Sequence, residues 1–149
     1  MEQTASPPAH VALTSAHGGR LQCVVVTPEM TVRESDAEFI ALPLSDGEIG
    51  IAPGHSPMIG RMGYGEMRLV SGGTTDRLYV DGGFVQVVDN VVSVLTNRAV
   101  PASSIDLHMA AEHLEAARKR KANTPELLAI RDRLELQARA QIRAARKAR

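Results

Sequence analysis

Five histidines are the residues of this sequence best suited to bind a metal or transfer a proton. A transition-metal site needs three or four such ligands converging on one point. His10 and His17 lie in an N-terminal segment without hydrophobic periodicity. His108 and His113 are five residues apart, which places them about 140° apart on a helix. His55 therefore has no partner at metal-ligand spacing, and we expect no metal site.

Nucleophilic and nucleotide chemistry have no better support in the sequence. Ser56 follows His55 directly, but the residues of a catalytic triad converge in space and sit in sharper local motifs. No Gly-x-Ser-x-Gly, Walker-type or dinucleotide-binding motif is present. The pairs Gly72-Gly73 and Gly82-Gly83 are more typical of hairpin turns than of phosphate-binding loops. We expect a chain that is not a catalyst by itself and has no cofactor.

The segment from Asp46 to Pro57 is the part of the chain most strongly specified by local chemistry. It contains three glycines, two prolines, two acids and one histidine around a short apolar pair. Glycine permits positive φ and close backbone approach, whereas proline fixes φ and removes a donor. The pattern predicts a turn, a very short strand over residues 48–51, and a tight turn at Pro53-Gly54.

Composition argues against several classes of function. The 149 residues carry a formal net charge of zero, and aromatic residues make up 3% with no tryptophan. We therefore expect neither an electrostatic field nor a stacking surface for nucleic acid. The single cysteine, Cys23, lies in an apolar run, cannot form an intramolecular disulfide and fits a reducing compartment. No apolar run approaches the roughly 20 residues of a membrane-spanning helix, and we expect no secretory signal.

Strand patterns fill the chain from residue 21 to about residue 100. Residues 1–20 show little periodicity, which predicts a mobile extension. After them, short β-branched or alternating runs are separated by turns rich in Gly, Asn and Asp, as is typical of an antiparallel sandwich or barrel. The sharpest hairpin prediction is the two-residue turn Asp89-Asn90. Strands are expected at 21–26, 31–34, 37–44, 58–62, 66–71, 77–80, 84–88 and 91–95, with structural turns at Gly72-Gly73 and at Gly82-Gly83.

The hydrophobic period changes from 2 to 3.6 after Pro101, which predicts two helices. Ser103 or Ser104 is expected to cap the first helix, with Asp106 in its first turn. Thr124-Pro125 supplies the cap and first residue of the second helix. A connection of about two residues predicts an antiparallel pair. The fold class is therefore α+β and mainly β, with a β-sandwich or barrel over residues 21–100 followed by a helical hairpin over residues 101–149.

Two blocks of the chain resemble the epsilon subunit of bacterial F-type ATP synthases. The first is Gly-Glu-Ile-Gly-Ile-Ala-Pro-Gly-His-Ser-Pro at residues 47–57, which is similar to the signature loop of that family. The second runs from Tyr79 to Leu95, with its Gly-Gly pair between apolar strands. Ile105-Asp106 matches the family's Ile/Leu-Asp at the start of the helical part. The resemblance extends from about Leu21 to the C-terminus and includes the order of sandwich and hairpin.

The resemblance implies roles for the loop and for the last helix. The loop is expected near the membrane c-ring and the gamma subunit, although an ordinary solvated turn would carry the same residues. The last helix carries seven bases and three acids, so seven minus three gives a local charge of +4. A charged helix face is ordinarily solvated, but the resemblance implies contact with an acidic segment of the catalytic beta subunit. The loop residues are Gly47, Glu48, Gly50, Pro53, Gly54 and His55, and the residues expected on the inhibitory helix are Arg131, Arg133, Arg139, Arg143, Arg146 and Lys147.

Some members of this family bind ATP through Ile/Leu-Asp-x-x-Arg-Ala at the start of the first helix. Here the segment reads Ile-Asp-Leu-His-Met-Ala over residues 105–110. Met109 stands where the motif has arginine, so the charge that would pair with a phosphate is missing. This difference argues against ATP sensing by this chain.

The function implied by the resemblance is that of a non-catalytic rotor-stalk subunit of a proton- or sodium-translocating ATP synthase. The sandwich would clamp the gamma subunit to the c-ring, and the hairpin would dock on the sandwich or open toward the alpha and beta subunits and inhibit ATP hydrolysis. The chain would then lie at the cytoplasmic face of the bacterial inner membrane, held there only through the complex. Two alternatives stay open: a free-standing β-barrel ligand-binding protein or enzyme with a helical dimerisation arm, and a nucleic-acid module using the basic helix.

Overall fold

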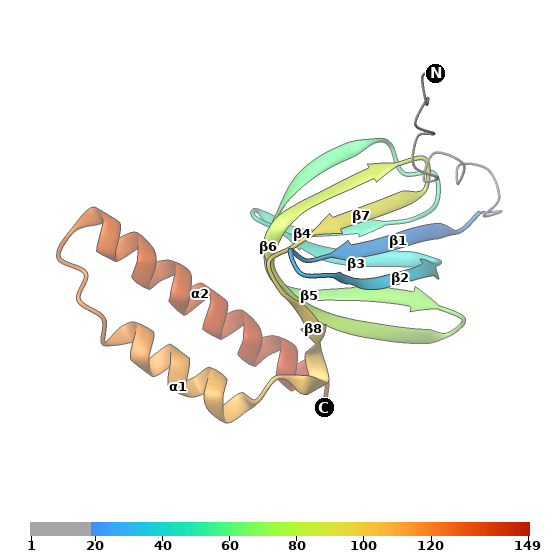
Figure 1. Ribbon diagram of the computed structural model, residues 1–149. Coiled ribbons are helices and arrows are strands. Elements are labelled where there is room, and N and C mark those ends of the chain that lie inside the picture. The colour runs from blue at the N-terminus through green and yellow to red at the C-terminus, as the bar shows by residue number, and fades with distance from the viewer. Residues whose placement is uncertain (1–18) are drawn as a thin grey trace, which may run out of the picture.

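The structure is a computed structural model that describes residues 19–149 (Figure 1). Eight strands form a β-sandwich, and a two-helix hairpin follows it, so the predicted fold class is confirmed. The strands are β1 (Leu21–Val26), β2 (Thr31–Ala37), β3 (Phe39–Leu44), β4 (Gly47–Ile51), β5 (Met58–Ser71), β6 (Thr74–Val88), β7 (Val91–Leu95) and β8 (Ala99–Pro101). A 3-10 turn η2 (Ala102–Ser104) leads to α1 (Leu107–Arg118) and α2 (Pro125–Lys147).

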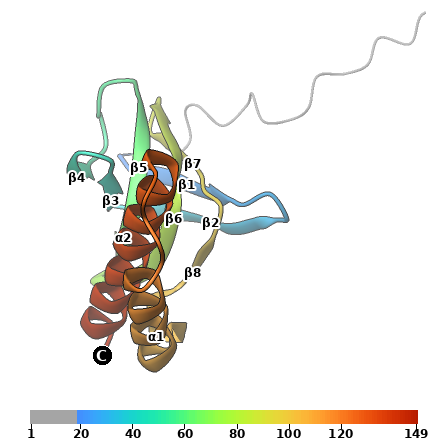
Figure 2. The ribbon, with the colours of Figure 1, turned by 90° about the vertical axis from the view of Figure 1, so that its left-hand side faces the viewer.

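The strands pair in the order β2-β1-β7-β6-β5-β3-β4, with β8 also paired to β6. Among these pairings β1–β7 is parallel and the others are antiparallel. Strand β6 changes partner along its length, because residues 84–88 pair with β7 whereas residues 78–80 pair with β8. Strands β5 and β6, with 14 and 15 residues, run side by side behind α2 in Figure 2.

The interior of the sandwich is filled by the inward-facing half of each strand. In β6, Leu78 and Val80 point inward while Tyr79 between them points to the opposite face, as the period of 2 requires. We call the inward-facing set the sandwich core; every member is at most 7% exposed. The sandwich core consists of Leu21, Cys23, Val25, Ala37, Ile40, Leu42, Ile51, Met62, Met67, Leu69, Leu78, Val80, Val85, Val87, Val92, Val94 and Ala99.

The prediction of a turn at Gly82-Gly83 was wrong, as was the break predicted at residues 63–65. Strands β5 and β6 run through both segments in one register, with Met62 opposite Gly83. Gly83 has φ +105°, and a Cβ there would lie 1.8 Å from the Leu95 carbonyl oxygen. The glycine pair thus lets a neighbouring strand end approach a continuous strand, rather than reversing the chain. The predicted turns at Gly72-Gly73 and Asp89-Asn90 are confirmed.

The two helices start from different caps. Asp106 is the N-cap of α1, and its carboxylate accepts hydrogen bonds from the backbone N–H groups of His108 and Met109. The prediction that Ser103 or Ser104 caps this helix was therefore wrong, because η2 intervenes. The predicted Thr124 cap of α2 is confirmed by its bond from Leu127 N. Since α1 ends at Arg118, the connection spans residues 119–124 and is longer than predicted.

Most of the predicted N-terminal extension lies outside the described residues, which begin at Gly19. Arg20, at its end, is held in place: its Nη2 donates to Ser71 Oγ at 2.8 Å and lies 3.4 Å from Glu38 Oε1. Within residues 19–149, neither helix combines the length and the apolarity that crossing a bilayer requires.

Candidate partner-binding surfaces

The glycine-rich loop begins with an edge strand whose charges lie on the surface. Strand β4 pairs with β3 on one side only, with Pro43 opposite Glu48. Glu48 is exposed, and its Oε1 accepts a hydrogen bond from Arg68 Nη2 at 2.6 Å. A Cβ on Gly50 would lie 2.7 Å from the ring of Phe39, so this glycine makes room for an aromatic side chain.

The second half of the loop is a turn fixed to the neighbouring β6–β7 hairpin. His55 N donates to Ala52 O at 3.2 Å, which closes the predicted turn around Pro53. Gly54 N donates to Asn90 Oδ1 at 2.7 Å, which ties the loop to the end of the sandwich where β6 turns into β7. His55 Nδ1 lies 2.7 Å from Ser56 O, so the half-buried imidazole is held by its own loop. The loop is therefore a pre-formed surface feature.

An exposed apolar face lies on the adjoining strands and was missed by the sequence analysis. Ile59, Phe84 and Leu95 are 77%, 57% and 55% exposed. Phe84 is the register partner of Leu95. Ile59 lies on the neighbouring strand, one position from Gly60, the partner of Val85. A groove of about 890 Å³ adjoins the face, lined among others by Phe84, Leu95 and Leu136 of α2. The signal was available: Phe84 and Leu95 are out of phase with the buried valines of their strands.

Helix α2 lies against β5 and β6, with α1 on its far side (Figures 1 and 2). The contact is formed by a second group of buried residues, here called the hairpin interface. It consists of Tyr79, Ala102, Ile105, Ala110, Ala140, Ala144 and Ala145. The period of 3.6 predicted the two helices, but not that Ala140 and Ala144 would be buried in one group with Tyr79 of the sandwich.

A polar contact accompanies the hairpin interface. Gln137 Nε2 lies 2.9 Å from Asp81 Oδ1 and 2.7 Å from Asp81 Oδ2, and donates to that carboxylate. Tyr79 Oη donates to Asp81 Oδ1 at 3.1 Å. Burial, and then the Asp81 carboxylate beside it, raise the pKa of the Tyr79 phenol far above its ordinary value. Strand β6 thus presents a carboxylate that joins the sandwich to the last helix.

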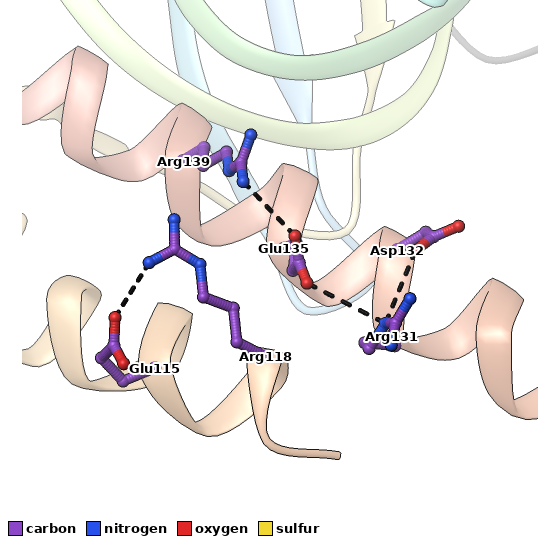
Figure 3. Close-up of polar contacts among 6 residues, drawn as sticks. All are labelled: Glu115, Arg118, Arg131, Asp132, Glu135 and Arg139. Carbon is purple, nitrogen blue, oxygen red and sulfur yellow. Dashed lines mark hydrogen bonds and ion pairs between the residues drawn. The ribbon is translucent and has the colours of Figure 1, made fainter. Parts of the chain in front are cut away.

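The basic residues of α2 divide into paired and unpaired groups. Arg131 lies 3.9 Å and Arg139 lies 3.4 Å from the same acid, Glu135, and Arg131 also lies 3.8 Å from Asp132 (Figure 3). Arg118 and Glu115 form a separate pair on α1 at 2.9 Å (Figure 3). Within residues 19–149, the other predicted bases form no such ion pair; they are Arg133, Arg143, Arg146 and Lys147.

Other reactive groups are inert or unavailable in the described chain. Burial raises the pKa of the Cys23 thiol to about 12, so it is neither a ready nucleophile nor a metal ligand at neutral pH. Within residues 19–149, no three His, Cys, Asp or Glu side chains come together as a metal site requires; His10 and His17 lie outside that range. At the ATP motif position, Met109 is 52% exposed, and the Asp106 carboxylate is engaged as a helix cap.

These features agree with a family comparison. Residues 20–102 match the model of the ATP synthase Delta/Epsilon chain, beta-sandwich domain. The chain belongs to the ATP synthase delta/epsilon family. The chain is 48% identical to the ATP synthase epsilon chain of Rhodopirellula baltica over 126 residues, which cover 85% of this chain and 98% of the relative. It is 42% identical to that of Desulfitobacterium hafniense strain Y51 over 96 residues, 64% of this chain and 73% of the relative.

Solved structures place the same fold in ATP synthase assemblies. A chain of the Euglena gracilis mitochondrial ATP synthase, in a structure of its OSCP, F1 and c-ring, superimposes with a TM-score of 0.71 at 26% identity, covering 87% of this chain and 81% of that chain. A chain of the Tetrahymena thermophila central stalk and c-ring has a TM-score of 0.67 at 12% identity and shows a shared fold. The chain is a non-catalytic epsilon-type subunit of the ATP synthase rotor, and the complex is membrane-associated.

Proposed function

We propose that the sandwich of this epsilon-type chain clamps the gamma subunit to the c-ring, and that its hairpin acts as a removable brake on ATP hydrolysis. The observation that carries the proposal is the contrast between a firmly built sandwich with exposed contact surfaces and a hairpin held largely through alanine side chains. The proposed location is the cytoplasmic face of the bacterial inner membrane, with attachment only through the complex.

The exposed apolar face supports docking of the gamma subunit. Contiguous exposed apolar side chains mark interaction surfaces in soluble domains, and Ile59, Phe84 and Leu95 present them on neighbouring strands. The loop supports a c-ring contact at the same end of β5 and β6, because it immediately precedes β5 and is tied to Asn90 after β6. In this proposal Gly47, Glu48, Gly50, Pro53, Gly54 and His55 supply the loop surface.

The unpaired bases of α2 support the brake. Arg143 and Lys147 are four residues apart and carry like charge, so they weaken an isolated helix and are relieved by an acidic partner. The proposed partner is an acidic segment of the beta subunit. Each exposed ion pair contributes only about 0–1 kcal/mol, so several together, screened by salt, would give a modest and reversible bias.

The clamp is tested by co-elution with the cognate alpha–beta–gamma subcomplex stripped of its own small subunit. The triple variant Ile59→Ser/Phe84→Ser/Leu95→Ser is expected to lose co-elution. Met109→Ser removes an apolar side chain of comparable exposure on α1 and is expected to keep it. Equal retention of both variants, each checked for native circular dichroism, would show that gamma does not use this face.

The brake is tested on the same subcomplex by its rate of ATP hydrolysis. Full-length chain should inhibit, and Arg133→Gln/Arg143→Gln/Arg146→Gln/Lys147→Gln should inhibit several-fold less, with the difference shrinking at high salt. The control Lys119→Gln/Arg120→Gln/Lys121→Gln removes bases from the α1–α2 connection. Inhibition unaffected by the four changes in α2 would remove the proposed role of this helix.

A further inference from the structure

We propose that two carboxylates on one face of the sandwich set the docking equilibrium of the hairpin in opposite directions: Asp81 holds α2 down, and Glu66, buried beneath it, favours release. This inference rests on the proposed braking function, in which the hairpin has a docked and a released state. It assigns the balance between those states to particular side chains of this chain.

Asp81 gains partners when the hairpin docks. Its two carboxylate oxygens lie 2.9 Å and 2.7 Å from Gln137 Nε2 on α2, whereas its bond from Tyr79 Oη is internal to strand β6. A hydrogen bond to a charged acceptor is stronger than one between neutral groups. Because Gln137 reaches Asp81 only when α2 lies on the sandwich, this contact stabilises the docked state alone.

Glu66 occupies the same outer face one strand away. It is the register partner of Tyr79, so the two side chains leave the sheet side by side, and Tyr79 packs against the alanines of α2. The Glu66 side chain is only 9% exposed. Its Oε1 accepts from Arg77 Nη1 at 2.6 Å, but its Oε2 is buried and has no hydrogen-bond partner in the described chain.

A second ion pair on the same sandwich has the exposure to water that Glu66 lacks. Glu48 and Arg68 are also 2.6 Å apart, but the Glu48 side chain is 57% exposed and remains accessible to water. A carboxylate oxygen that is buried without a donor loses its hydration, and no hydrogen bond within the protein compensates for that loss. Helix α2 packs on β5 and on Tyr79, the register partner of Glu66, and from this we infer that docking buries this oxygen and that release restores its hydration.

The test measures undocking directly in the isolated full-length chain. Ala144 is 2% exposed and faces the sandwich, so the thiol introduced by Ala144→Cys reacts with a thiol reagent when α2 leaves. Cys23 is fully buried in the sandwich core and reports global unfolding in the same sample. Site-resolved mass spectrometry then gives the two labelling rates separately.

Added to Ala144→Cys, Glu66→Gln is expected to slow labelling at position 144 by about three- to tenfold, because a neutral amide loses less hydration on burial than a carboxylate oxygen without a donor. Gln137→Ala is expected to accelerate it by a similar factor. Asp76→Asn removes a carboxylate from an exposed pair, 2.8 Å from Arg33, and should change the rate by less than about twofold. Glu66→Met serves as a second variant, and unchanged Cys23 labelling shows that each protein is folded.

Labelling at position 144 that is unchanged or faster in both Glu66 variants would overturn the proposal, as would an unchanged rate in Gln137→Ala. Equal rates at position 144 and at Cys23 would also overturn it, because the hairpin would then leave only when the sandwich unfolds. A third outcome separates the two proposals. If the Glu66 and Gln137 variants shift the labelling rate in opposite directions but inhibit ATP hydrolysis as the unchanged protein does, the carboxylate roles are supported and the proposed brake is refuted.

Discussion

The sandwich core and the hairpin interface are built from different side chains. In the sandwich core, Val, Leu, Ile and Met supply most of the buried surface. In the hairpin interface, alanine occupies five of the seven buried positions. A buried Leu, Ile, Val or Met stabilises a fold by about 1.5–3 kcal/mol, and alanine buries much less area. One chain therefore combines a core of large apolar side chains with an interface built mainly from small ones.

The largest effect should come from the sandwich, at Gly83. Gly83→Ala would place a Cβ 1.8 Å from the Leu95 carbonyl oxygen at φ +105°, so we expect a loss of more than about 4 kcal/mol in the free energy of unfolding, or failure to fold. Gly72→Ala, at φ +58° with no atom within 4 Å, should cost only about 1 kcal/mol. Urea denaturation compares the two variants; similar losses would refute a steric role for Gly83.

A cavity made in the sandwich core by substitution should also lower the free energy of unfolding strongly. Leu42 is fully buried, so Leu42→Ala is expected to lower the free energy of unfolding by about 2–5 kcal/mol. The control Leu128→Ala changes a leucine that is 40% exposed on α2 and should cost less than about 1 kcal/mol. The measurement is urea denaturation followed by circular dichroism. A Leu42→Ala loss as small as that of the control would contradict the assigned core.

A substitution in the hairpin interface should weaken docking of the hairpin without destabilising the sandwich. Ala144→Leu overfills a position packed near Tyr79 and should weaken docking by about 1–3 kcal/mol. The chain has two tyrosines and no tryptophan, and both Tyr64 and Tyr79 contact this interface, so tyrosine fluorescence reports docking. In Ala144→Leu the midpoint of the fluorescence transition should fall to a lower urea concentration. The midpoint of the β-sheet circular dichroism signal should not change. Transitions that move together would show that the two regions are one cooperative unit.

Rising alkaline pH should destabilise the sandwich core first and the hairpin interface at higher pH. The pKa of Cys23 is raised from 9.0 to about 12 by burial, so the native thiol stays protonated where the unfolded one ionises. The stabilisation is complete below pH 9 and is lost by about 1.4 kcal/mol per pH unit as the pH rises toward 12. Tyr79, with an ordinary value of 10.0, adds the same sign of effect at the hairpin interface at higher pH. Cys23→Ala should flatten the pH dependence between pH 9 and 10; an unaltered slope would contradict the assignment.

The smallest effect concerns a helix end outside both buried sets. Asp106→Ala removes the acceptor for the His108 and Met109 backbone N–H groups and should cost about 1 kcal/mol of helix stability. Fraying should be confined to α1 in amide hydrogen exchange. Asp132→Ala, on the exposed side of α2, provides the control, and equal fraying in both variants would show that Asp106 has no special role.

The sequence predicts what depends on local chemistry. Strand β1, the strand within the glycine-rich loop, the Asp89-Asn90 turn and the Thr124 cap follow from neighbouring residues, and all are present in the structure. The breaks predicted within β5 and β6 were wrong because closely spaced glycines have the same local signature in a turn and in a strand that another segment approaches closely. Only the position of Leu95 in space separates these cases for Gly83.

The candidate surfaces show the same limit. The turn of the glycine-rich loop can be predicted because it depends on residues adjacent in sequence. The contact between Asp81 and Gln137 joins residues 56 positions apart and has no signature in either segment. Glu66 has the sequence context of an ordinary strand carboxylate, yet its side chain is only 9% exposed in the structure. A long-range contact of this kind depends on how the hairpin packs, which periodicity does not determine.

The parallel pairing of β1 with β7 has a consequence for synthesis of the chain. Gln22 is aligned with Val91, so the first strand waits for about seventy residues before this partner emerges from the ribosome. Helix α2 begins at Pro125, after the last strand of the sheet, so it leaves the ribosome after every strand. The hairpin is thus the last part of the chain to become available for packing, and in the proposed function its contact with the sandwich is also the one that is reversed.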